Sequence, residues 1–333
     1  MKRIVTPGRV FLLGLVLAAV VLASVIVPSN DYIFLPDPAH PVAPLVSVPG
    51  GKEPKVGGVY YVDVIVRKAK LLEKLFGGLH EGADLYPASQ INPPGVDDSQ
   101  RRQIDLQDMR NSQLVAAAVA LKAAGRKVVT RSVGAKVDVV EDGQPAVGKL
   151  EPDDVIVAID GARVKSPQAV FDAMKKHKPG DVVAFTITRG KQTLTKRIKT
   201  VASTTPPKGR AVVGIFLEPA LDIRLPLAVR IDAGGVGGPS AGLAFALDIL
   251  QQLGRNVVHG HKIAATGEIL PDGSVGPIGG IKQKTIGARE AHVDAFLVPA
   301  GENAQDAKRY AHGLRIIPVE TFPQALRALA TLR

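Results

Sequence analysis

The residue most suited to chemistry in this sequence is Ser240, within Gly-Gly-Val-Gly-Gly-Pro-Ser-Ala-Gly over residues 234–242. Leucines and alanines follow at helical spacing up to Gly254, which predicts that Ser240 lies where a loop becomes a helix. A helix N-terminus offers free N–H groups and a positive dipole end, which would stabilise a developing oxyanion. The segment alone fits equally well a glycine-rich turn whose serine caps the helix. A phosphate-binding loop is disfavoured because no Gly-Lys-Ser/Thr follows the glycines.

Two further motifs follow along the chain: Thr-Gly-Glu over residues 266–268 and Pro-Ile-Gly-Gly-Ile-Lys-Gln-Lys over residues 277–284. In this order and near this spacing, the three motifs resemble the proteolytic domain of Lon proteases, over about residues 205–333. In that family the serine and the second lysine of Lys-x-Lys form a catalytic dyad. The resemblance therefore implies that Ser240 and Lys284 are catalytic, and it suggests that Thr266 orients the lysine.

One position departs from the family pattern. Many Lon proteins have aspartate just before Gly-Pro-Ser, where this chain has Gly237. The departure argues against a gating role for an acidic residue at this position, but it does not affect the dyad.

The choice between Lys282 and Lys284 also has an argument from helix geometry. Side chains two residues apart on a helix point in different directions, so both lysines cannot face Ser240. Lys284 shares its stripe with Ile281, Ala288 and Ala291, an apolar face that is predicted to be buried. Lys282 shares its stripe with Thr285, Ile286 and Arg289, a mixed face that is predicted to meet water.

A serine hydroxyl needs a base to take its proton, and a lysine can be that base only when it is neutral. Burial lowers the pKa of a lysine, and residues 278–281 offer no carboxylate that would hold Lys284 charged. We expect Ser240 to attack a peptide carbonyl, with Lys284 acting first as base and then as acid. Backbone N–H groups around Gly238, Pro239, Ser240 and Ala241 would form the oxyanion hole. No metal or other cofactor is required.

Composition excludes other classes of protein. The 333 residues can hold two modest domains, and the absence of cysteine excludes a thiol nucleophile and a disulfide framework. The net charge of +11 comes from scattered Lys and Arg without a basic run interleaved with aromatics, so nucleic-acid binding is disfavoured. A homo-oligomer is compatible with the sequence.

The N-terminus predicts a membrane anchor over residues 1–27. Lys2, Arg3 and Arg9 precede an uncharged apolar run from Val10 to Val27, which is about long enough to span hydrocarbon as a helix. Its basic flank predicts a cytoplasmic N-terminus in the cell membrane, with all later residues, including the catalytic domain, outside the cytoplasm. A cleaved signal peptide is the alternative, but residues 23–27 lack a good small-x-small site.

Two segments without a catalytic signature follow the apolar run. Residues 28–57 contain seven prolines and are predicted to be an extended tether. Residues 58–125 are predicted to be a membrane-proximal α/β region of structural role, with a long helix that begins at Asp98-Ser99 and ends at Gly125.

Residues 126–202 resemble a bacterial PDZ domain. The resemblance rests on Gly-Lys-Leu-Glu-Pro-Asp-Asp-Val-Ile-Val-Ala-Ile-Asp-Gly over residues 148–161, with Asp153 where glycine is common. PDZ domains bind a peptide by adding it as a strand to a sheet edge. The resemblance places the peptide-binding loop near Gly134, Ala135, Lys136 and Val137.

The whole chain is therefore predicted to be α+β: an N-terminal transmembrane helix, a PDZ-like β-rich domain, and a Lon-type α+β proteolytic domain over residues 203–333. This layout resembles the membrane-anchored PDZ–Lon proteases of bacteria. No Gly-x-x-x-x-Gly-Lys-Ser/Thr is present. The resemblance implies an ATP-independent serine endopeptidase that acts on extracytoplasmic proteins or peptides.

Three other interpretations compete with this one. Residues 238–242 also fit the Gly-x-Ser-x-Gly elbow of an esterase, with Asp294 and His312 following in the right order, but the domain over residues 203–333 is too short for that fold. A non-enzymatic adaptor that binds peptides through its PDZ domain is the second. A metal site at His259 and His261 is the third, but two histidines without a third ligand nearby are expected to be surface residues.

Overall fold

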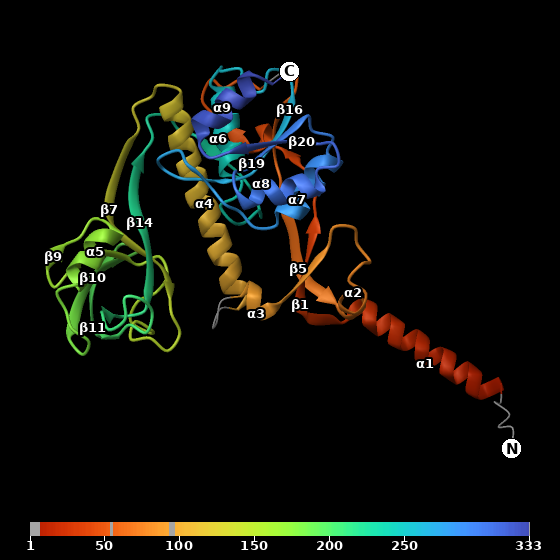
Figure 1. Cartoon of the computed structure of the whole chain (residues 1–333), viewed down its shortest axis with the longest axis horizontal. Helices are drawn as coiled ribbons and strands as arrows, with labels where there is room; N and C mark the ends of the chain where they lie inside the picture. The colour runs from red at the N-terminus through yellow and green to blue at the C-terminus, as the bar shows by residue number, and fades with distance from the viewer. Residues whose placement is uncertain (1–6, 54–55, 93–96, 333) are drawn as a thin grey trace. The chain divides into compact units, whose positions relative to one another are not determined.

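The computed structural model describes residues 7–53, 56–92 and 97–332 (Figure 1). The chain forms two compact units. One unit combines the chain up to Lys127 with the chain from Leu225 onward, and the other is Val128–Arg224. The first unit is therefore discontinuous in sequence, because the second is inserted into it.

A five-stranded sheet forms the centre of the first unit, in the order β2-β4-β16-β19-β20. The strands β4 (Gly58–Tyr61), β16 (Lys262–Ala265), β19 (Ala295–Pro299) and β20 (Arg315–Val319) run parallel, and the short β2 (His40–Pro41) pairs antiparallel with β4. A parallel sheet is covered on both faces, and β19 is buried along its whole length.

The side chains of the sheet alternate between two hydrophobic clusters. Ile263, Ala265 and Leu297 join one cluster with α4 (Asp98–Ala123), α6 (Gly242–Gln252) and α9 (Phe322–Ala330). Ala264 and Phe296 join the other with α7 (Ile281–Glu290) and α8 (Glu302–Tyr310). Because successive strand residues point to opposite faces, α6 and α7 cover opposite faces of the sheet.

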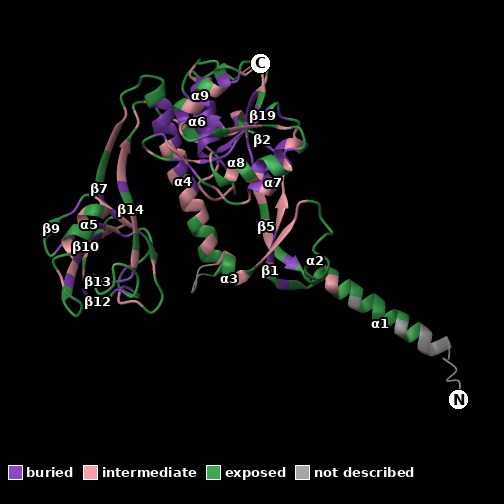
Figure 2. Ribbon diagram, in the orientation of Figure 1, coloured by how far each residue is buried: buried purple, intermediate pink, exposed green. Residues whose placement is uncertain are grey.

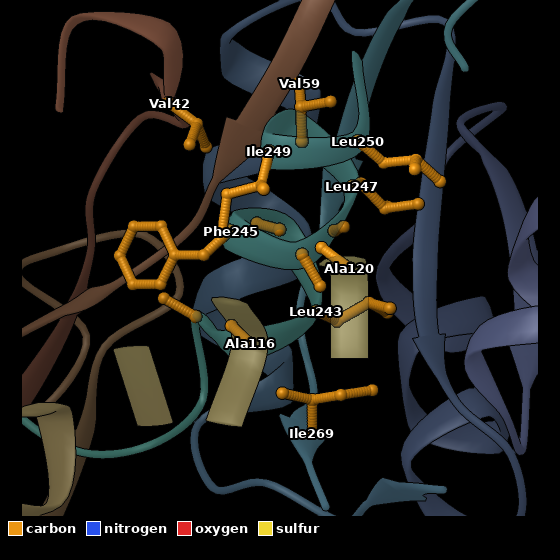
Figure 3. Packing of buried hydrophobic residues seen from close by; sticks show 14 of the residues in the cluster. Val42, Val59, Ala116, Ala120, Leu243, Phe245, Leu247, Ile249, Leu250 and Ile269 are labelled. Atoms are coloured by element: carbon orange, nitrogen blue, oxygen red, sulfur yellow. The ribbon is translucent and has the colours of Figure 1, made fainter. Parts of the chain in front are cut away.

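The central helix of the first unit is α6. Its residues are buried on every side from Gly242 to Leu250, as is typical of a core helix (Figure 2). It packs closely against α4 because α4 presents the small residues Ala116 and Ala120 at the contact (Figure 3). Asp97 caps α4 by accepting hydrogen bonds from the N–H groups of Ser99 and Gln100.

Residues 28–57 are folded into the first unit, so the prediction of an extended tether is wrong for the described part of this segment; Pro54 and Lys55 lie outside it. The strand β1 (Pro28–Pro36) pairs with β5 (Val64–Lys70) and β6 (Asp84–Pro87), and β3 (Val46–Ser47) pairs with β15 (Arg230–Ile231). Apolar side chains between the prolines, including Val42, Val46 and Val48, enter the main core. The short helix η1 (Ala43–Leu45) lies in this segment, and α2 (Leu71–Leu75) and α3 (Ala88–Ile91) follow it along the chain.

Residues 58–125 do not form a separate membrane-proximal region either. The strand β4 lies inside the central sheet, and α4 packs on α6. These residues and those after Leu225 therefore build one core.

The second unit is built on a sheet in the order β11-β10-β8-β7-β14. Its elements are β7 (Val129–Val140), β8 (Val155–Ile159), β9 (Ala162–Arg163), α5 (Pro167–Met174), β10 (Val182–Arg189), β11 (Gln192–Lys199), β12 (Val201–Ala202), β13 (Ala211–Val212) and β14 (Ile215–Arg224). The unit extends past the predicted boundary at residue 202 because β14 pairs along most of β7.

The N-terminal helix α1 spans Pro7–Ile26. Over the residues that the structure describes, no helix is long and apolar enough to cross a membrane. The span predicted over Val10–Val27 is therefore not confirmed. Lys2 and Arg3, on which the predicted orientation depends, lie outside the described residues.

Candidate active site

The structure places Ser240 directly before α6, as the sequence predicts. Ala241 is the N-cap and Gly242 the first helical residue. Gly242 is required by close packing, because a Cβ there would lie 2.7 Å from Ser112 Oγ and 2.9 Å from Ile269 Cγ2. The close approach fixes the start of α6 and so the position of the serine.

Lys284, on the first turns of α7, reaches the serine hydroxyl. Its Nζ donates to Ser240 Oγ at 2.6 Å and to Thr266 Oγ1 at 3.3 Å. Thr266 directly follows β16, is fully buried, and donates through Oγ1 to the carbonyl of Ser240 at 3.2 Å. The three residues singled out in the sequence therefore form one hydrogen-bonded group.

Burial gives Lys284 the properties of a base. The residue is 4% exposed, and this burial lowers its pKa from 10.5 to about 8, although Asp63 acts in the opposite direction. A substantial neutral fraction is thus present at mildly basic pH, and a neutral amine next to a hydroxyl can accept its proton. The expectation that no carboxylate affects Lys284 is therefore wrong. It considered only the neighbours of Lys284 in the sequence, and Asp63 is distant along the chain.

Lys282 points elsewhere. Its Nζ pairs with Asp84 Oδ1 at 2.8 Å and donates to the carbonyl of Ala83 at 3.3 Å. The stripe of Lys282 was predicted to meet water, but Thr285 and Ile286 on it are buried. The prediction failed for these two because α7 also packs against β1, which the sequence had assigned to the tether.

The loop that carries Ser240 is attached to α4 by three hydrogen bonds. Ser112 Oγ donates to the carbonyl of Pro239 at 2.8 Å, the Gly238 N–H donates to the carbonyl of Asp105 at 2.7 Å, and Arg102 Nη2 donates to the carbonyl of Gly235. Ser112 is buried, as suits a residue that fixes a backbone loop. Sequence analysis missed these residues because nothing in the spacing of residues 58–124 indicates contact with a loop so far along the chain.

The structure leaves fewer N–H groups for the predicted oxyanion hole than the sequence suggested. Pro239 has no N–H, and the N–H of Gly238 already donates to Asp105. The N–H groups of Ser240 and Ala241 remain as candidate donors at the start of α6. The positive end of the α6 dipole adds to their effect on an oxyanion.

The predicted peptide-binding residues Gly134, Ala135, Lys136 and Val137 lie inside β7. Ala135 is paired with Pro219 of β14 on one side and with Ile156 of β8 on the other. A strand with neighbours on both sides cannot accept a peptide strand, so this prediction is wrong.

The edge of that sheet next to β7 is formed by β14, and a cavity of about 570 Å³ lies beside β14. Phe171 and Met174 of α5 line the cavity together with Ile215, Phe216 and Leu217 of β14. Sequence analysis missed this groove because β14 lies beyond the predicted end of the domain.

The residues of the competing interpretations do not converge on Ser240. Asp294 Oδ2 accepts a hydrogen bond from the Lys262 N–H at 2.8 Å and lies 3.5 Å from His261 Nδ1. Asp294 therefore contacts the first residue of β16 and the residue before it. The partner of Ser240 is Lys284, which argues against an esterase triad with Asp294 and His312.

Comparisons with known proteins match two parts of this chain to known domains. Residues 224–331 match the family model of the Lon protease (S16) C-terminal proteolytic domain, and residues 104–200 match the PDZ domain model. The PDZ match begins within α4 and stops before β14, whereas the structural unit is Val128–Arg224.

Similar curated proteins are Lon proteases. Lon protease 1 of Myxococcus xanthus is 37% identical over 99 residues, which cover 28% of this chain and 12% of that protein. Lon protease of Azorhizobium caulinodans is 33% identical over 150 residues, or 41% of this chain and 17% of that protein. The chain therefore spans a small part of the length of these relatives.

Among solved structures, the PDZ domain of the SdrC-like protein from Listeria monocytogenes is 33% identical and covers 26% of this chain and 87% of that one, with a TM-score of 0.24. A second, from Listeria innocua, is 31% identical and covers 25% of this chain and 92% of that one, with a TM-score of 0.24. The PDZ assignment rests on the family model and not on these likenesses.

The buried amine of Lys284 should reduce the stability of the fold. At about 1.4 kcal/mol for each pH unit between 10.5 and about 8, its burial costs up to about 3 kcal/mol at pH 7. Lys284→Met should therefore raise the free energy of unfolding at pH 7. The gain should be complete below about pH 8, where the lysine is protonated folded and unfolded, and should shrink to the packing contribution above pH 10.5.

Denaturant unfolding of wild type and variant from pH 7 to 10.5 measures this gain. Lys282→Met, at the partly exposed, ion-paired neighbour, is the matched control and should give no such gain. A difference between Lys284→Met and wild type that does not change with pH would contradict the prediction.

Proposed function

We propose that this chain, which carries a Lon-type (S16) proteolytic domain and a PDZ domain before it, is a serine peptidase that hydrolyses peptide bonds in protein substrates. The observation that carries the proposal is the 2.6 Å hydrogen bond from Lys284 Nζ to Ser240 Oγ in a buried environment. A lysine with a lowered pKa beside an otherwise weak nucleophile is the arrangement that activates a serine.

The reaction proceeds in two halves. Lys284 Nζ takes the Ser240 proton as Oγ bonds to the substrate carbonyl carbon, and the N–H groups of Ser240 and Ala241 stabilise the oxyanion. The lysine then gives the proton to the leaving amine as the C–N bond breaks. Water, deprotonated by the same lysine, attacks the carbonyl carbon of the resulting ester, and the lysine returns that proton to Ser240 Oγ as the ester bond breaks. Thr266 keeps Nζ in line through its own hydroxyl.

The proposed hydrolysis does not use ATP. The 333 residues contain no Gly-x-x-x-x-Gly-Lys-Ser/Thr, and every protein group that the two halves of the reaction require comes from the described residues of the site. Cleavage should accordingly proceed at the same rate when all nucleotide has been removed with apyrase.

Removal of either dyad residue should abolish cleavage. Ser240→Ala and Lys284→Ala should each lower kcat/KM for a short unstructured peptide by roughly four orders of magnitude or more, because the pair acts as a unit. In the wild type, kcat/KM should rise as the pH passes through about 8, since the neutral lysine is the active form. Fluorogenic peptide assays from pH 6 to 10 measure both effects.

Lys282→Ala is the matched control, and it should retain substantial activity. Labelling with a serine-directed phosphonate separates an enzyme from a non-enzymatic adaptor, because an adaptor would not label at Ser240. An inactive Lys282→Ala together with an active, folded Lys284→Ala would contradict the assignment of the base.

We further propose that the cavity between α5 and β14 binds the peptide of a substrate protein as an added strand. The free edge of β14 offers the backbone groups, and Phe171, Met174 and Phe216 offer an apolar pocket for a side chain. This groove replaces the one that the sequence predicted on β7.

A charge in this groove should affect protein substrates selectively. Phe171→Glu should lower the rate of cleavage of an unfolded protein roughly tenfold, because it removes an apolar anchor, and should leave cleavage of a short peptide unchanged. Val182→Glu is the matched control, an exposed apolar residue of the same unit that does not line the cavity. Equal losses on both substrates would show that the groove has no role in substrate binding.

We also propose that the chain is anchored in the cell membrane, with its catalytic unit outside the cytoplasm. The support is the uncharged sequence from Val10 to Val27 and the exposure of its apolar side chains, among them Phe11, Leu12 and Leu22. Largely exposed apolar side chains such as these are stabilised by contact with lipid.

Topology is tested by adding a protease to intact cells that produce the chain. The protease should digest residues after Val27, and the protein should remain with the membrane fraction after a high-salt wash. Release of a soluble, N-terminally trimmed protein would contradict the anchor.

A further inference from the structure

Three titratable side chains, Asp37, His40 and Asp63, gather beside the dyad. His40 Nε2 lies 3.1 Å from Asp37 Oδ2, and one nitrogen or oxygen of each residue lies within 4.8 Å of the others. Asp63 Oδ1 is buried, and within the described residues it has no hydrogen-bond partner. A buried carboxylate oxygen without a partner is costly, so its retention points to a role in the chemistry of its neighbours.

This cluster lies along the face of α7 that carries Lys284. A Cβ on Gly280 would lie 2.8 Å from Cγ2 of Val64, the residue after Asp63. A Cβ on Gly287 would lie 1.8 Å from the carbonyl oxygen of Asp37, and the N–H of Ala39 donates to the Gly287 carbonyl at 3.1 Å. Lys284 is four residues after Gly280 and three before Gly287, so the three positions share one face of the helix.

Charge connects Asp63 to the lysine. Asp63 raises the pKa of Lys284 against the effect of burial, and Lys284 in turn lowers that of Asp63. Burial is the largest cause of the raised pKa of Asp63, followed by the neighbouring charge of Asp37. His40 lowers the pKa of Asp63 and so favours its charged form. Burial and the charge of Asp63 raise the pKa of the neighbouring Tyr61.

We propose that Asp63 is a positioning residue for the dyad: its carboxylate stabilises the ammonium that forms when Lys284 takes the proton of Ser240, and Asp37 and His40 control the charge on that carboxylate. The inference rests on the proposed peptidase function. The serine proton moves to Nζ and stays there until the leaving amine takes it, so Asp63 exchanges no proton with the substrate. Its contribution is greatest when Nζ is charged, which is the state between attack and departure of the amine.

The inference predicts that only one of two neighbouring substitutions moves the pH–rate limb to lower pH. Asp63→Asn removes the negative charge and makes Lys284 a weaker base. Its pH–rate limb should move to lower pH, and its plateau rate should fall about tenfold. Asp37→Asn removes the charge that disfavours ionisation of Asp63, so its limb should lie at or above the wild-type pH.

The readout is the rate at which a serine-directed phosphonate labels Ser240 in the full chain, measured from pH 6 to 10. Labelling needs no turnover and no identified substrate, and each variant is checked by its thermal unfolding midpoint. Asp84→Asn is the matched control, since Asp84 binds Lys282 and Gln283 of the same helix and should leave the limb in place.

The outcomes separate the two proposals. If the wild type does not label at any pH, the peptidase function fails. If the wild type labels with a rising limb and Asp63→Asn has the same limb, or a limb at higher pH, the role of Asp63 is overturned and the peptidase stands. If Asp63→Asn does not fold, Asp37→Asn decides the question. A shift of its pH–rate limb to lower pH then overturns the inference.

Discussion

The first unit is arranged around one contact, the hydrogen bond between Nζ of the buried Lys284 and Ser240 Oγ. The serine comes from the loop that leads into α6 on one face of the central sheet, and the lysine comes from α7 on the other. They meet beyond the last residue of β16, where Thr266 contacts both. The ends of parallel strands are a common place for such sites, because helices on both faces converge there.

Segments far apart in the sequence complete this contact. The N-terminal residues supply β4, which pairs with β16, and then α4, whose Ser112 and Asp105 bind the serine loop. Because unit Val128–Arg224 follows α4 and precedes β15, the chain leaves the proteolytic core and returns to it. The helix that holds the serine loop is also the element from which the chain enters the PDZ unit.

Sequence reasoning identified the residues of the site whose motifs are local. Ser240 at a helix start and Lys284 on an apolar stripe were predicted from their neighbours, Thr266 was suggested by the family resemblance, and the structure brings the three together. Predictions that required long-range pairing failed. The proline-rich segment looked like a tether because its partners β5, β6 and β15 are distant, and β14 was assigned to the wrong domain because its partner β7 precedes it by some 75 residues.

A contact between distant parts of the chain also explains the glycine at position 237, where the family pattern often has aspartate. A Cβ on Gly237 would lie 2.7 Å from Cβ of Asp105, so α4 leaves no room for a side chain there. The space beside the serine loop is instead bordered by a carboxylate from another element, and burial raises the pKa of Asp105. The motif therefore departs from its family pattern for a steric reason that lies more than a hundred residues away, and an acidic group stands next to this loop even though its sequence contains none.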